Sequence, residues 1–114
     1  AFGHDAFQRA LLPQLKATEA RVRANAAKAM FTLGSPLALR ILEAMGESRT
    51  IENRLSGVWA LANLKKPETI QRAFDFAKYE KNNALQRRML RFIDDAEDDI
   101  REAKFGSRPL RRVA

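Results

Sequence analysis

Three arginines recur along the chain at nearly constant spacing, and arginine is well suited to gripping anions. Arg9 and Arg40 are 31 residues apart, and Arg72 follows 32 residues later. Lys78 and Tyr79 lie just beyond, adding an ammonium group and an aromatic ring. A guanidinium group can bind a carboxylate or a phosphate through two parallel hydrogen bonds. These five residues form the predicted partner-binding site, with a solvated helix face carrying incidental charges as the alternative.

The sequence offers little material for catalysis. His4 is the only histidine and lies near the start of the chain, and there is no cysteine. No glycine-rich phosphate loop occurs, and no serine or threonine has a candidate base beside it in the sequence. The lack of cysteine excludes disulfide bonds, thiolate catalysis and cysteine-ligated zinc. We therefore predict a protein that is not an enzyme, with no cofactor, no metal site and no catalytic residues.

An acidic block near the C-terminal end of the chain could bind a cation or face a partner. It contains Asp94, Asp95, Glu97, Asp98, Asp99 and Glu102. The block lacks the glycine turn and the alternation of a calcium-binding loop, which argues against a metal site. The favoured interpretation is a solvated cap on the last structural unit, with an intramolecular or partner-facing patch as the alternative.

Composition limits the fold and the location. With 114 residues, the chain has room for one compact domain around one modest core. Its many alanines, leucines and arginines and its 5 glycines favour helix over strand. The net charge of +7 draws the chain to polyanions or acidic proteins. The absence of cysteine and of any apolar run of about 18 residues predicts a cytoplasmic protein with no membrane span.

The spacing of apolar residues predicts six helices. They are expected over residues 5–16, 19–33, 36–45, 51–64 and 67–79, and from residue 82 or 83 onward. Thr18 is the predicted N-cap of the second helix, and Gly34 is its predicted stop. Lys65 stands in the later turn where Gly34 stands in the earlier one, so that helix end is expected to be made differently. Leu37 and Phe74 belong to apolar stripes and are expected to face the core.

The pattern of residues 22–42 returns 31 residues later in residues 53–73. The aligned pairs are Ala26 with Gly57, Ala27 with Val58, Met30 with Leu61, Leu33 with Leu64 and Pro36 with Pro67. A degenerate third copy starts at Leu85. Each helix pair has apolar residues that it cannot bury alone, and stacking of neighbouring pairs buries them. The predicted fold class is all-α, a short right-handed α-solenoid (α–α superhelix) of about six helices in three antiparallel pairs.

This order of residues resembles the short bacterial HEAT repeat of the phycobilisome-lyase type. On that resemblance, residues 1–104 form a HEAT-like repeat domain, and residues 105–114 form a basic tail or linker. The repeats are placed at about 19–48, 50–80 and, in degenerate form, 82–104, with a half-repeat at 5–16. The resemblance implies that the second helix of each pair lines a concave binding face, which would carry the predicted partner-binding residues. It also implies that Arg23 and Arg54 bond to acids or carbonyls of adjacent repeats.

Two further positions follow from the alignment of the repeats. Gly57 lies within a predicted helix at a cost of about 1 kcal/mol relative to alanine, and close helix packing is the expected reason. Trp59 aligns with Lys28, a position of exposed type. Packing in the core or between repeats is the favoured role for Trp59, and contact with a partner is the alternative.

The expected function is a non-enzymatic protein–protein interaction or scaffold module, forming one domain of a larger protein. The expected partner is an acidic protein segment or another domain of the parent protein. The alternative is a nucleic-acid-binding HEAT-like domain that uses a basic concave surface. A lyase subunit that handles a bilin chromophore has no support from the residues.

Overall fold

The computed structural model describes residues 19–105, which contain five α-helices and no strand. The helices are α2 (Ala20–Thr32), α3 (Pro36–Gly46), α4 (Ile51–Asn63), α5 (Pro67–Tyr79) and α6 (Asn83–Phe105). The prediction of an all-α protein is therefore confirmed for this part of the chain. The predicted helix at 5–16 lies outside the described residues, so six helices in three pairs are not what the structure shows. Phe105, the first residue of the predicted tail, belongs to α6, and the rest of that tail lies outside the described residues.

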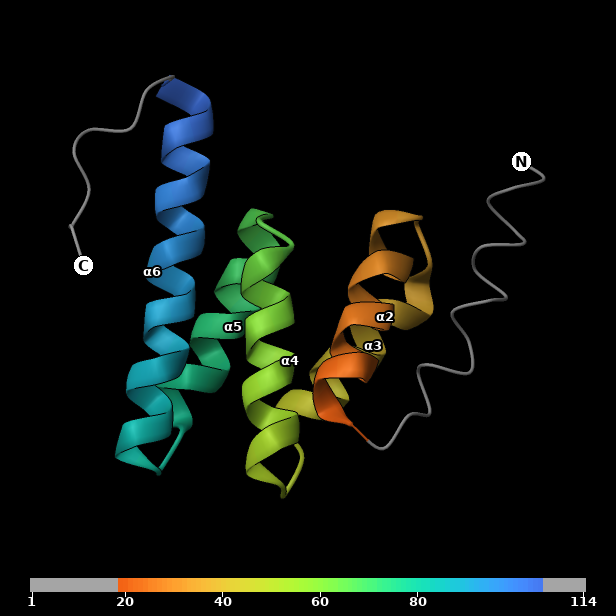
Figure 1. Cartoon of the computed structure of the whole chain (residues 1–114), viewed down its shortest axis with the longest axis vertical. Helices are drawn as coiled ribbons and strands as arrows, with labels where there is room; N and C mark the ends of the chain where they lie inside the picture. The colour runs from red at the N-terminus through yellow and green to blue at the C-terminus, as the bar shows by residue number, and fades with distance from the viewer. Residues whose placement is uncertain (1–18, 106–114) are drawn as a thin grey trace.

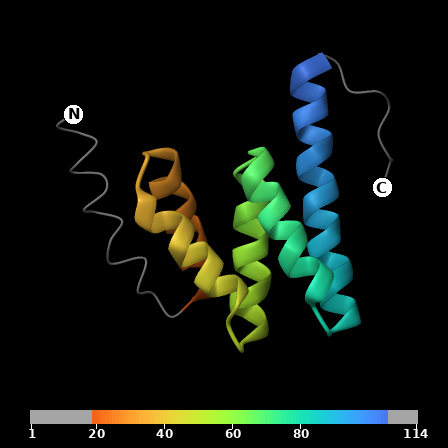
Figure 2. The ribbon, with the colours of Figure 1, turned by 180° about the vertical axis from the view of Figure 1, so that it is seen from behind.

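The five helices form two layers (Figure 1). α2, α4 and α6 lie in one layer with α4 in the middle, and α3 and α5 lie across its other side, as the reverse view shows (Figure 2). α4 packs against each of the other four described helices. Two consecutive pairs, α2–α3 and α4–α5, are joined by short turns, while α6 packs on α4 and α5 as a single helix. The predicted third pair is thus represented here by α6 alone.

The core is densest around α4, because this central helix is covered on several sides. Val58 and Leu61 have no exposed surface, and Met89 of α6 is 1% exposed. A Cβ atom added at Gly57 would lie 2.9 Å from Cβ of Met45 and 3.1 Å from the carbonyl oxygen of Leu42. The first distance is too short for two carbon atoms and the second is tight, so a side chain at this position would push α3 away from α4. The expected packing role of Gly57 is confirmed.

Two apolar residues predicted to be buried are exposed instead. Leu37 is 43% exposed and Phe74 is 42% exposed. α3 and α5 form one of the two layers, and the residues that they bury include small ones. Ala38 of α3 packs with Ala26 and Met30 of α2, and Ala73 of α5 belongs to the main core cluster. The prediction was wrong because a helix with neighbours mainly on one side buries a narrower stripe than its apolar periodicity indicates.

The helix starts agree with the predicted turns, apart from a shift of one residue at the N-cap of α2. Pro36 and Pro67 each occupy the start of a helix, as predicted. The N-cap of α2 is Glu19, one residue after the predicted cap at Thr18, which lies outside the described residues.

The end of α4 shares a left-handed residue with the end of α2, but the N–H group that follows bonds differently, as expected. Ser35 N donates to the carbonyl of Met30 at 3.0 Å, whereas Lys66 N donates to Oγ1 of Thr69 at 3.2 Å. Lys65 adopts a left-handed φ of 58°, corresponding to the φ of 89° at Gly34.

Replacing Lys65 by glycine is expected to raise the free energy of unfolding by up to about 1 kcal/mol, because lysine is strained in the left-handed conformation. Loss of the exposed ion pair between Lys65 Nζ and Asp99, at 3.1 Å, offsets part of this gain. Urea denaturation of Lys65→Gly and of Asp99→Asn separates the two terms. The reciprocal variant Gly34→Lys should be destabilised, and equal stability of Gly34→Lys and the wild type would contradict the strain argument.

Candidate functional site: a charged cleft between α3 and α5

Three of the five predicted site residues meet at one open cleft of about 690 Å³. Its described lining residues are Gly46, Glu47, Arg54, Arg72, Asp75, Phe76, Lys78, Tyr79, Glu80 and Lys81. Arg72, Lys78 and Tyr79 are thus brought together by α5. Arg40 is exposed on α3 and is not among these lining residues. Arg9 lies outside the described residues, so the structure does not place it.

Arg72 is not a free cation in this cleft. Its Nε donates a hydrogen bond to Oε2 of Glu43 at 2.9 Å, which ties α5 to α3. The guanidinium group also lies 4.5 Å from the centre of the Phe76 ring, and Asp75 is 4.0 Å from its Nη1. A new anion would therefore compete with two carboxylates already beside Arg72. The row of arginines predicted from the sequence did not anticipate Glu43, which is 29 residues away in the chain.

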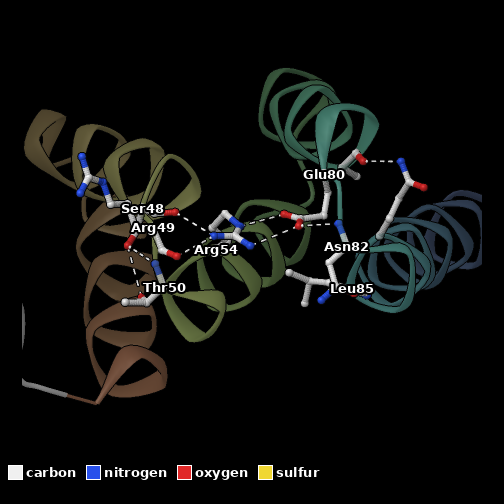
Figure 3. A network of polar contacts seen from close by, with 9 residues as sticks. Ser48, Arg49, Thr50, Arg54, Glu80, Asn82 and Leu85 are labelled. Atoms are coloured by element: carbon white, nitrogen blue, oxygen red, sulfur yellow. Dashed lines mark hydrogen bonds and ion pairs between the residues drawn. The ribbon is translucent and has the colours of Figure 1, made fainter.

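The inner wall of the cleft is a polar network centred on Arg54 (Figure 3). Nε and Nη2 of Arg54 donate to the two carboxylate oxygens of Glu80, at 2.8 and 3.2 Å. Nη1 donates to the backbone carbonyls of Ser48 and Arg49, at 3.1 and 2.9 Å. Arg54 therefore joins the end of α3, the start of α4 and the end of α5. The expected bonding of this arginine to acids and carbonyls is confirmed.

Glu80, the carboxylate of this network, is largely enclosed, because its side chain is only 5% exposed. Burial alone raises its pKa. The pKa of Glu80 is nevertheless below its usual value. The carboxylate accepts hydrogen bonds from the Arg54 side chain and from the backbone N–H groups of Asn82 and Lys81, and it lies beside the charge of Arg54. Together these interactions lower the pKa more than burial raises it. The carboxylate is therefore ionised at neutral pH and neutralises Arg54.

Equivalent positions in the neighbouring units make related bonds. Nη2 of Arg23 donates to Oδ1 of Asn53, which links α2 to α4. Gln86, 32 residues after Arg54, donates to the carbonyl of Ala77 at 2.9 Å, near the end of α5. These contacts join each helix pair to the next helix, and they support a structural role for the ladder that Arg23 and Arg54 begin.

The outer rim of the cleft carries one exposed aromatic ring beside a lysine. Tyr79 is 76% exposed, and the Nζ atom of Lys78 lies 5.2 Å from its ring. Phe74 is also exposed on α5, 5.9 Å from the same Nζ atom, but it is not among the residues that line the cleft.

Trp59 lies partly in the core and partly at the surface. Its side chain packs against the main buried cluster. On the outer side, the Arg21 guanidinium carbon lies 4.0 Å and the Lys28 Nζ lies 5.0 Å from the ring centre. The favoured core-packing role is therefore supported. The outer face of the Trp59 ring is in contact with two charged side chains of α2.

The acidic block of α6 is engaged in ion pairs. Asp99 pairs with Lys65 of the α4–α5 turn at 3.1 Å, and Asp98 pairs with Arg101 at 2.6 Å. Within residues 19–105, no group of three or more histidine, cysteine, aspartate or glutamate residues could hold a metal ion. In the same range, no helix is both long and apolar enough to cross a membrane. Asp98 and Asp99 thus form intramolecular ion pairs, which fits the alternative interpretation of the acidic block, and its role as a cap stays a prediction.

Comparison with known proteins gives no relative from which a role could be transferred. No family model matches the chain, and neither a curated protein nor a solved structure matches it.

Proposed function

We propose that the chain is a non-enzymatic protein-interaction module, built as a short HEAT-like α-solenoid, that binds an acidic segment of another protein or of its own parent protein. The observation that carries this proposal is the rim of the cleft, where Tyr79 is exposed beside Lys78. Large exposed aromatic residues are enriched at the centres of protein interfaces. The repeat of bonds and turns at intervals of 31 or 32 residues supports the solenoid.

The lysines and the exposed ring of the cleft favour an acidic peptide with an apolar anchor. Lys78 and Lys81 stand at the cleft without a carboxylate partner among the described residues, whereas Arg54 and Arg72 are already paired. An apolar side chain would cover the Tyr79 ring while neighbouring carboxylates approach the lysines. Glu47, Asp75 and Glu80 also line the cleft and repel the carboxylates of a peptide and the phosphates of a nucleic acid alike, so the choice of a peptide rests on the exposed aromatic ring rather than on charge.

Selection from a displayed library of random 12-residue peptides tests this proposal. Peptides that combine acidic residues with an aromatic or aliphatic residue are expected to be enriched. Lys78→Glu and Tyr79→Ala should each weaken their binding about tenfold, since interface residues of this type contribute about 1–2 kcal/mol. Arg87→Glu makes the same charge change at an exposed position of α6 and should have little effect. Binding unaffected by the two cleft variants would contradict the proposal.

A further inference from the structure

A second cationic surface lies on the other layer, over α4, and is distinct from the cleft. We call the residues Arg21, Lys28, Trp59 and Arg88 the Trp59 cluster. Arg21 and Lys28 are seven residues apart on α2, which is about two helical turns, so both reach the same ring on α4. Arg88 comes from α6, on the opposite side of α4. Three helices therefore contribute to the cluster.

Arg21 and Lys28 lie over the same ring, and the charge of Arg88 acts on Arg21 from α6. Partial burial, and in second place the nearby charge of Arg88, lower the pKa of Arg21. Among the described residues, no carboxylate forms an ion pair with Arg21, Lys28 or Arg88, although Arg54, Lys65, Arg72 and Arg101 each have one. Like charges held together without a counter-charge raise the energy of the free protein, and a bound anion would remove that cost.

The geometry of Arg21 suits a phosphate group. Its guanidinium carbon lies 4.0 Å from the centre of the Trp59 ring, a contact that engages the flat face of the guanidinium group. The N–H donors lie at the edge of that plane and stay available for phosphate oxygens. The stacking also limits the conformations of the side chain, which reduces the entropy lost on binding.

A hollow beside Arg21 adds a buried hydroxyl group. This open hollow, of about 720 Å³, lies between the starts of α2 and α4, and Arg21, Arg23 and Ser56 are among its lining residues. Ser56 is 6% exposed, and its hydroxyl makes no hydrogen bond to another residue in the described range. Glu19 and Glu52 also line the hollow and would repel an anion, which provides a direct test.

We propose that the Trp59 cluster binds closely spaced phosphate groups, supplied either by a free polyphosphate or by the backbone of a single-stranded nucleic acid. Three cations from three helices match an anion that carries several charges better than a single carboxylate. The site is on the layer of α2, α4 and α6, so it does not depend on the protein-binding cleft of α3 and α5.

Trp59 provides the measurement, because it is the only tryptophan of the chain. Its fluorescence is titrated at low salt with sodium tripolyphosphate and with a twelve-residue oligo(dT), and calorimetry is run in parallel. Saturable binding is expected. Comparable affinity for the two probes would identify a polyphosphate site. Tighter binding of oligo(dT), with log K falling by about 2 per unit of log salt for three cations, would identify a nucleic-acid site.

Four variants make the test specific. Arg21→Gln and Arg88→Gln should each weaken binding about tenfold through the loss of charge-assisted hydrogen bonds. Arg40→Gln removes the same charge from the other layer and should change the affinity less than about twofold. Glu52→Gln should strengthen binding. The proposal is overturned if neither probe binds by fluorescence or calorimetry, or if Arg40→Gln weakens binding as much as Arg21→Gln.

Discussion

Replacement of Arg54 by methionine is expected to lower the free energy of unfolding by about 3–5 kcal/mol, because it leaves a buried carboxylate without its partner. The side chain of Glu80 is 5% exposed and receives two hydrogen bonds from Arg54. The carbonyls of Ser48 and Arg49 lose a donor in the same variant. Domains of this size are stable by about 5–15 kcal/mol, so much of the total would be lost. Urea denaturation at pH 7 measures the difference.

The double variant Arg54→Met/Glu80→Gln is the matched control for this prediction. A neutral glutamine removes the unpaired charge, so the double variant should be more stable than Arg54→Met alone. If the double variant is no more stable, or if Arg54→Met costs less than about 1 kcal/mol, the pair does not stabilise the junction of α3, α4 and α5 in the proposed way.

The same pair predicts how stability depends on pH. The folded pKa of Glu80 is lowered, so its carboxylate contributes stability above the unfolded pKa of about 4.3. That contribution is lost as the pH falls through the folded pKa. The stability difference between the wild type and Glu80→Gln should therefore be constant between pH 7 and about pH 5 and should shrink below that range.

The Gly57→Ala variant is expected to lower the free energy of unfolding by about 1–3 kcal/mol, through overpacking between α3 and α4. The new methyl group would lie 2.9 Å from Cβ of Met45 and 3.0 Å from the backbone nitrogen of Gly46. Alanine favours helix over glycine by about 1 kcal/mol, so helix propensity alone predicts the opposite sign. Chemical denaturation therefore decides between the two effects.

Ser56→Ala is the control for that variant. It changes the adjacent buried position of α4 without adding a heavy atom, and its stability should stay close to that of the wild type. Stability of Gly57→Ala equal to or above that of the wild type would show that α3 can move away from α4 at little cost.

Features governed by residues close together in the chain could be predicted well. Pro36 and Pro67 were correctly placed at helix starts, because proline fixes φ and has no N–H to lose there. The bounds predicted for the helices that became α3, α4 and α5 differ from those observed by at most one residue at either end. The 31-residue recurrence also predicted correctly that Gly57 packs closely, and the resemblance to HEAT repeats predicted correctly that Arg54 bonds to carbonyls and an acid.

Contacts between layers could not be predicted, because they depend on how the helices cross. Three findings depend on residues that are distant in sequence. They are the pairing of Arg72 with Glu43, the exposure of Leu37 and Phe74, and the gathering of Arg21 and Lys28 over Trp59. The left-handed conformation of Lys65 is also imposed by the return of α5 against α4. The sequence by itself determined the helices, their turns and the small residues between them. The tertiary structure decided which charges are neutralised and which stay available, because that depends on distances across the two layers.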